Sequence, residues 1–254
     1  MEKRTLVTTS WDDGHVLDQR LADMLATYGI RGTFYIAPEN SELKADERLS
    51  CEGVRTLAQN FEIGAHTLTH RHLPTLFVDE ARREIAGSKE VLEKMIGRPV
   101  TSFCYPAGKY TKVHPPLVRE AGFTCARTVK RFAYTAGNDP YEMPTSVHTY
   151  KHWLDVWGVL QLADYNPFRF LRLYRAWDKQ AVAMFDRVRR EGGVFHLWGH
   201  SWEVEAHGDW ERLEQVLQYI GGHADVQYVT NGEVNKMLDS RYQIADISYP
   251  MSTT

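Results

Sequence analysis

Short apolar runs alternate along the chain with stretches in which apolar residues recur every three or four positions. The first run, residues 6–9 (LVTT), is typical of a strand. Apolar residues then recur with the spacing of one face of an amphipathic helix: Leu17, Leu21, Met24, Leu25 and Tyr28. Gly29 is placed to cap the end of this helix. The chain therefore begins with a predicted strand followed by a predicted helix.

The same alternation continues through the rest of the chain. Further strands are predicted at residues 33–36, 61–65, 100–105, 123–126, 193–198 and 226–230. Further helices are predicted at residues 78–95, 114–121, 176–190, 209–220 and about 231–238, with Asn231 as the N-cap of the last one. Residues 127–175 hold many aromatic and polar residues, and they predict long loops with at most one helix.

The regular succession of strands and helices favours a parallel sheet. Six or seven strands suit either a barrel or a doubly wound sheet. No predicted strand is followed by GxGxxG or GxxxxGK[ST], so the usual nucleotide-binding signals are missing from the sequence. The chain has no internal repeat and no low-complexity linker. We expect a single domain over residues 1–254, with a tail after about residue 240.

The composition agrees with a globular α/β protein, since 43% of the 254 residues are hydrophobic. The net charge of −3 is spread along the chain without a long basic run, which argues against a nucleic-acid partner. No apolar stretch approaches the ~18 residues of a membrane span. Cys51, Cys104 and Cys125 form no CxxC pair, and the N-terminus has no apolar segment of signal-peptide length. We therefore expect free thiols and a cytoplasmic location.

Four stretches with chemically reactive side chains follow predicted strands: residues 12–14, 66–70, 105–108 and 200–203. In parallel barrels, active sites gather at the end where the strands finish. The first stretch, Asp12-Asp13-Gly14, has a simpler explanation as a solvated turn, because Asp-Gly is a common turn pair. The shared position of all four stretches nevertheless favours a common site.

The pair of histidines at positions 66 and 70 is spaced so that both can bind one metal ion. His66 and His70 follow a strand and precede Pro74, so a loop or a single helical turn must hold them, and His72 could exchange roles with His70. One of the two aspartates would add a third ligand. Two imidazoles and one carboxylate leave positions for water and substrate, as in hydrolytic zinc sites.

The order of these motifs resembles the polysaccharide deacetylase family, which is also described as the NodB homology domain or carbohydrate esterase family 4. The features that carry the resemblance are Asp12-Asp13-Gly14 after a strand, the His66-Thr67-Leu68-Thr69-His70 segment, a Pro-x-Gly loop and a late strand that ends in histidine. They span residues 8–203. The resemblance implies a distorted (β/α)7 barrel.

The resemblance also implies a ligand set and a base. Asp12 matches the family's general base, while Asp13, His66 and His70 match its metal ligands. Zinc is the expected divalent metal, with cobalt, nickel or manganese as alternatives. A bound cation lowers the pKa of its water toward neutral, which makes a nucleophile available near pH 7.

The remaining catalytic groups are implied by the later motifs. The backbone N–H of Ala107, in the loop that also contains Pro106 and Gly108, matches a donor to the oxyanion. His200 is the expected general acid. His196 is the alternative, and we prefer His200 because it follows the strand whereas His196 lies within it.

The sequence departs from the family where an arginine often holds the catalytic aspartate. That position is Cys104, for which a small buried strand residue is the simplest interpretation. Another residue must orient Asp12, and Lys109 and Arg127 are both candidates. Ala107 stands where the family often has an aromatic residue, which predicts a wider pocket.

Several other side chains near the motifs have two interpretations. Trp202 could stack on a sugar, and Glu203 could hydrogen-bond a histidine or cap a loop, whereas Trp198 is expected to pack in the core. The family's fourth motif has no secure match, but its region contains His148, His152, Trp153 and Asp155. Three arginines are expected to form a solvated helix face, or alternatively to meet an anionic substrate such as a nucleotide- or lipid-phosphate-linked sugar: Arg169, Arg172 and Arg175.

Together these features predict an enzyme, a metal-dependent hydrolase that removes an N-acyl group from an amino sugar or carbohydrate intermediate. Acetyl is the expected acyl group and formyl an alternative. Two other functions stay open: the same fold acting on a non-sugar C–N bond such as a ureide, or an inactive barrel that binds metal or carbohydrate. The sequence does not determine the oligomeric state.

Overall fold

The computed structural model describes residues 4–237, and it is built around one parallel sheet. Every pairing between its strands is parallel. The strands are β1 (Thr5–Asp13), β2 (Gly32–Ile36), β3 (Glu62–Ala65), β4 (Ser102–Cys104), β5 (Cys125–Arg127), β6 (Val147–His148), β7 (Gly193–Gly199) and β8 (Val226–Tyr228).

The sheet is closed into a distorted barrel by a short stretch of chain before β6. The strands follow the order β5-β4-β3-β2-β1-β7-β6, with β8 paired to the start of β1. Met143 pairs in parallel with Arg127 of β5, and the chain then enters β6, which pairs with β7. Residues 143–148 therefore join the two edges of the sheet. The predicted (β/α)7 barrel is confirmed, with β8 as an additional strand.

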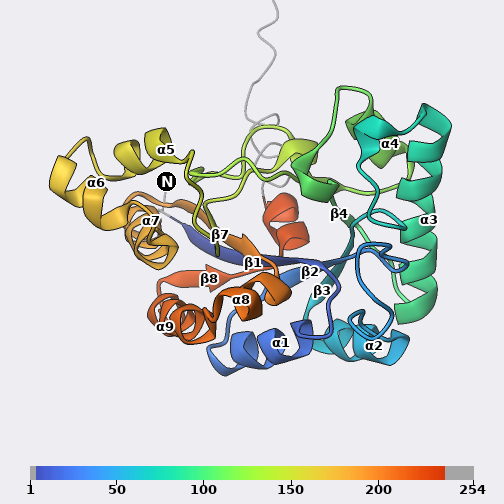
Figure 1. Ribbon diagram of the computed structural model, residues 1–254, viewed down its shortest axis with the longest axis horizontal. Coiled ribbons are helices and arrows are strands. Elements are labelled where there is room, and N and C mark those ends of the chain that lie inside the picture. Colours follow the sequence, from blue (N-terminus) through green and yellow to red (C-terminus); the bar gives the residue numbers. More distant parts are fainter. Residues whose placement is uncertain (1–3, 238–254) are drawn as a thin grey trace, which may run out of the picture.

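Helices surround the sheet at the right, bottom and left of Figure 1. They are α1 (Asp18–Thr27), α2 (Cys51–Asn60), α3 (Val78–Ile96), α4 (His114–Glu120), α5 (Val156–Leu162), α6 (Pro167–Leu173), α7 (Trp177–Glu191), α8 (Ser201–His207) and α9 (Trp210–Ile220). Three short 3-10 helices are η1 (Leu73–Thr75), η2 (Pro106–Gly108) and η3 (Pro140–Glu142). Within residues 4–237, no helix is long and apolar enough to cross a membrane.

The strands are short and covered on both sides, which explains their continuous apolar runs. All nine residues of β1 are buried. Large side chains fill the space between the strands and the helices, among them Trp11, Phe34, Phe103 and Phe195, none of which is exposed. Because all the strands run in the same direction, the loops that follow their carboxyl ends lie together at one end of the barrel.

The predicted long helices and the predicted strands lie where expected, with shifts of one or two residues at their ends, except that β1 continues to Asp13, four residues beyond the predicted end at residue 9. The prediction of at most one helix within residues 127–175 is wrong, because α5 and α6 both form there. Each has only seven residues, too few for a repeating apolar pattern. Three other elements, α2, α8 and β6, were not predicted from the sequence.

The end of the chain requires one correction. Residues 231–237 are helical, but Asn231 is not the N-cap. Thr230 accepts a hydrogen bond from the N–H of Glu233, whose carboxylate accepts one from the N–H of Thr230. Asn231 instead bonds Thr8 and Tyr35 beneath the barrel. The tail predicted after about residue 240 lies outside the described residues.

Candidate active site

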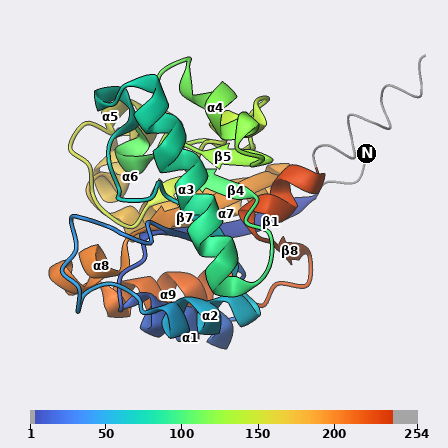
Figure 2. The ribbon, with the colours of Figure 1, turned by 90° about the vertical axis from the view of Figure 1, so that its right-hand side faces the viewer.

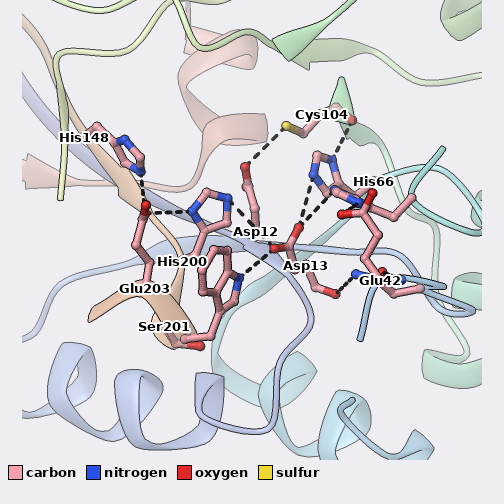
Figure 3. Close-up of polar contacts among 12 residues, drawn as sticks. Asp12, Asp13, Glu42, His66, Cys104, His148, His200, Ser201 and Glu203 are labelled. Atoms are coloured by element: carbon pink, nitrogen blue, oxygen red, sulfur yellow. Dashed lines mark hydrogen bonds and ion pairs between the residues drawn. The ribbon is translucent and has the colours of Figure 1, made fainter. Parts of the chain in front are cut away.

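The two aspartates occupy the last two positions of β1, paired in register with Tyr35 and Ile36 of β2. Successive side chains of a strand point to opposite faces. Asp13 does not follow this alternation, because its φ of 81° turns the backbone and changes the direction of its side chain. Gly14 continues the turn with a φ of 75°, and a Cβ there would lie 2.8 Å from Ile36. Both buried carboxylates therefore reach the mouth of the barrel (Figure 3).

Asp13 meets the two predicted histidines in one cluster. Its Oδ1 lies 3.1 Å from Nε2 of His70 and 3.7 Å from Nε2 of His66. Both histidines belong to an irregular loop after β3, in which Thr67 and His70 have positive φ values. A loop rather than a helical turn therefore holds the pair. His72 is not part of any cluster of possible ligands among the described residues.

The protonation of His66 makes this cluster suited to a cation. Its Nδ1 lies 2.9 Å from the carbonyl oxygen of Cys104, which can only accept a hydrogen bond. Burial lowers the pKa of His66 to about 4, so the ring is neutral and Nε2 presents a lone pair. Oδ1 of Asp13 is buried and accepts no hydrogen bond from the described residues. The lone pair on Nε2 of His66 and the carboxylate oxygen of Asp13 face each other, and both are attracted to a positive ion. These residues are therefore chemically suited to bind a metal ion.

Three further side chains hold the candidate ligands in place. Oε2 of Glu42 lies 3.0 Å from Nδ1 of His70, the carboxylate–histidine arrangement that fixes metal-binding imidazoles. The amide of Asn40 donates to the backbone carbonyl of Asp13. The indole N–H of Trp202 donates to Oδ2 of Asp13 over 2.8 Å. Trp202 thus contacts the ligand carboxylate directly, and its ring is partly exposed beside it.

Two further clusters, one of which shares His66 with the first, are less suited to a metal. Asp12, His66 and Cys104 lie close together, but Arg127 already neutralises Asp12, and burial raises the pKa of the Cys104 thiol well above its usual value. The third cluster consists of His148, His200 and Glu203. There the carboxylate of Glu203 already pairs with both histidines.

Arg127 is the residue that orients Asp12. It is completely buried, and its Nη2 donates to both carboxylate oxygens of Asp12. Arg127 lies on β5 in register with Cys104 on β4, so the guanidinium comes from the strand next to the one where the family often has it. Burial works against the charged form of Asp12, but Arg127, His66 and His200 outweigh it and keep its pKa below the usual value. Lys109 is exposed and forms no ion pair with Asp12.

Of the two candidate acids, His200 is the one that lies beside the aspartates. Its Nε2 is 3.9 Å from Oδ2 of Asp13, and its Nδ1 is 3.1 Å from Oε2 of Glu203 (Figure 3). Burial alone would lower the pKa of His200, but Glu203 and the aspartates raise it to about 9. His196 instead bonds Ser10 inside the barrel over 2.8 Å, and burial lowers its pKa to about 3.

Glu203 connects the site to the region of His148 and His152, in which the sequence showed no secure match to the family's fourth motif. The same Oε2 that meets His200 lies 3.0 Å from Nε2 of His148. His148 stacks on the buried ring of Trp198, and its Nδ1 lies 2.7 Å from Nε2 of His152. Burial lowers the pKa of His148 to about 3, so the ring is neutral. Asp155 is turned away and pairs with Arg131.

The Pro-x-Gly loop forms η2 on the far side of the barrel mouth. Pro106 is buried, whereas Ala107 is exposed and has a φ of 51°. Gly108 has a φ of 65°, and a Cβ there would lie 2.1 Å from Val129. The wider pocket expected from the small side chain at position 107 stays a prediction.

Known proteins that are similar to this chain in sequence are polysaccharide deacetylases or are described as such. The family model described as polysaccharide deacetylase matches residues 2–126. The chain is 26% identical over 144 residues to "Putative polysaccharide deacetylase YxkH" of Bacillus subtilis, covering 56% of this chain and 50% of that protein. It is 30% identical over 95 residues to the peptidoglycan-N-acetylglucosamine deacetylase of Bacillus cereus, covering 36% of this chain and 32% of the relative. The chain thus spans half or less of the length of these relatives.

The barrel as a whole also has a solved counterpart. A crystal structure described as a "putative polysaccharide deacetylase" from Mycobacterium smegmatis superposes with a TM-score of 0.69 over 99% of this chain and 94% of that one, at 18% identity. Fold and cluster define a barrel with a candidate metal centre at its mouth. Residues 2–126, just under half of the 254-residue chain, match the polysaccharide deacetylase family, and the barrel as a whole has the fold of the Mycobacterium smegmatis structure.

Proposed function

We propose that this protein is a metal-dependent hydrolase that removes an N-acyl group, acetyl or formyl, from an amino sugar or a related carbohydrate. One observation carries the proposal: Asp13, His66 and His70 converge on one point while Asp12 lies beside them, held by Arg127 instead of sharing the cluster. A base that is free of the ligand set and adjacent to it is what metal-assisted hydrolysis requires.

Asp13, His66 and His70 would hold the divalent ion, for which two imidazoles and one carboxylate favour zinc, with cobalt, nickel or manganese as alternatives. When bound, such an ion polarises the acyl carbonyl and lowers the pKa of a water molecule. Glu42 and Trp202 would keep the ligands oriented, since both contact them directly.

The remaining residues supply the proton transfers. Asp12, ionised because Arg127 faces it, takes a proton from the attacking water. The backbone N–H of Ala107, an exposed residue, is the expected donor to the developing oxyanion. His200 carries a proton that it gives to the leaving amine, and Glu203 holds its ring in the required orientation. The name of the Bacillus cereus relative, a peptidoglycan-N-acetylglucosamine deacetylase, supports an N-acylated amino sugar as the substrate class.

The test is an assay of the zinc-loaded protein for released acetate or formate on N-acetylated and N-formylated sugars, nucleotide sugars and oligosaccharides. We expect Asp12→Asn to lower the hydrolysis rate by roughly 10²–10⁴-fold while the bound metal stays near one ion per chain, because Asp12 acts on the proton and not on the ion. An unchanged rate in Asp12→Asn would exclude this residue as the base. Failure to release either acid from every substrate would exclude the proposed function.

A further inference from the structure

The surface of α5, α6 and the loop before them carries an unusual concentration of exposed apolar side chains. Those of Leu154, Trp157, Phe168 and Leu171 are 92%, 73%, 83% and 71% exposed. Trp153, Val156 and Tyr165 are also exposed in the same segment. Monomeric soluble proteins rarely expose such a contiguous set without a binding role. We call residues 151–172 with Arg175 the apolar–basic patch.

The buried side of this segment shows that the exposed residues are not a misplaced core. Val159, Leu162 and Leu173 point inward and are buried against the rest of the protein. The loop before α5 is also fixed, because Asp155 pairs with Arg131 and the Tyr174 hydroxyl donates to the carbonyl of Trp153. The segment therefore has two apolar sides: one is packed against the rest of the protein, and the other, the patch, faces outward.

Basic side chains border the apolar ones. Residues 150–175 contain four Lys or Arg and two Asp, a net charge of +2 in a chain whose total is −3. Lys151, Arg172 and Arg175 form no ion pair within the part of the chain that the structure describes. The guanidinium of Arg175 lies 3.8 Å from the ring centre of Trp153. The unpaired cations suit a negatively charged partner.

We propose that the apolar–basic patch binds the surface of an anionic lipid bilayer. Trp, Phe and Leu enter the boundary between headgroups and acyl chains, while Lys and Arg beside them meet the anionic headgroups. A second copy of the chain fits less well, because a two-fold contact would bring together two copies of a segment with a net charge of +2. This inference does not depend on the proposed reaction.

The patch lies at the active-site end of the molecule. His152, next to Trp153, contacts His148 of the site. Figure 2 shows α5 and α6 toward the left, on the same side as α8, which begins directly after His200 of the site. Binding through the patch would therefore bring the mouth of the barrel close to the lipid surface.

The test is cosedimentation of the full chain with vesicles of phosphatidylcholine alone or of phosphatidylcholine mixed with phosphatidylglycerol. We expect binding to the anionic vesicles, weakened by salt, and little binding to the neutral ones. Phe168→Ser should weaken binding about tenfold, since one phenyl ring no longer leaves water. Phe77→Ser is the matched control, because Phe77 is also 83% exposed but lies on the N-terminal side of α3, and its binding should equal that of the wild type.

Three results would each overturn the inference. The first is no binding to vesicles that contain phosphatidylglycerol. The second is equal binding by Phe168→Ser and Phe77→Ser. The third is a dimer in light scattering that Phe168→Ser converts to a monomer, which would assign the patch to a second copy of the chain. Both substitutions are at exposed positions, so both variants are expected to fold.

Discussion

The carboxylate of Asp12 is held by an arginine from the neighbouring strand, because Cys104 on β4 and Arg127 on β5 lie in register. A side chain as long as arginine can reach the same carboxylate from either position. The buried thiol of Cys104 lies 3.8 Å from Asp12 and leaves the space that Arg127 fills. The sequence analysis left Lys109 and Arg127 open as candidates, since nothing local distinguishes them.

Arg127→Ala should lower the free energy of unfolding by about 3–5 kcal/mol, because it leaves a buried carboxylate unpaired. Burial then raises the pKa of Asp12, so activity should fall as well. Adding Cys104→Arg to this variant should recover part of both losses. Urea unfolding and the acyl-release assay measure them, and Arg127→Lys keeps a positive charge in case the alanine variant does not fold. A double variant no better than Arg127→Ala would contradict the interpretation.

His66→Ala should abolish binding of one metal ion per chain, because His66 offers a lone pair to the cluster. His72→Ala is the control, since His72 lies on the same loop but outside every cluster of possible ligands that the described residues form. Metal content after dialysis distinguishes the two variants. Full metal content in His66→Ala, or loss of metal from His72→Ala, would mean that the ligand set is wrong.

At the scale of elements, four of the eight described non-glycine residues with positive φ lie at or just after the ends of β1, β3 and β4. Asp13, Thr67, His70 and Ala107 all have positive φ, and all lie at the mouth of the barrel. Residues in this conformation cost free energy, and the surrounding structure must hold them. Motif spacing predicted that these segments are functional, but their conformations depend on contacts with neighbouring loops, such as the hydrogen bond between Asn40 and Asp13.

The turn at Gly108 should tolerate no side chain. Gly108→Ala adds a Cβ that would lie 2.1 Å from Val129, in addition to the cost of positive φ. Gly208→Ala is a matched control, because Gly208 has the same φ of 65° and no atom within 4 Å of the added Cβ. We expect Gly208→Ala to cost about 1 kcal/mol and Gly108→Ala at least about 1–3 kcal/mol more. Equal midpoints in urea unfolding would show that Val129 can move aside.

At the scale of the whole molecule, one carboxylate at the base of the barrel connects distant parts of the chain. Glu62 accepts hydrogen bonds from the hydroxyls of Thr33 and Ser102 and from the backbone N–H of Gly232. These groups come from β2, β4 and the helical segment near the end of the described chain. The barrel is thus joined at its base by residues up to 170 positions apart.

Glu62→Ala should therefore lower the free energy of unfolding by roughly 1–3 kcal/mol, because it leaves these donors without their acceptor. Glu52→Ala is the control, since the Glu52 carboxylate is exposed and, among the described residues, pairs only with Arg55 on the same helix surface. Metal content should stay unchanged in both variants, as Glu62 lies in the first position of β3 and the ligands follow its end. Equal unfolding midpoints for the two variants would refute the structural role of Glu62.

Local patterns determined most of the fold in advance. Long helices such as α3 and α7 were predictable because their apolar stripes repeat over several turns, and the motif residues at the strand ends were predictable because each motif is contiguous. The seven-residue helices α5, α6 and α8 were not, because tertiary packing and not periodicity stabilises helices this short.

The sequence by itself determined the alternation of elements and the set of candidate side chains, because both are properties of neighbouring residues. Only the tertiary structure decided that Arg127 and not Lys109 holds Asp12, that His200 and not His196 faces the aspartates, and that Glu42 supports His70. Each of these depends on the register between strands or on the approach of two loops. Such contacts join residues far apart in the chain, and no local pattern specifies them.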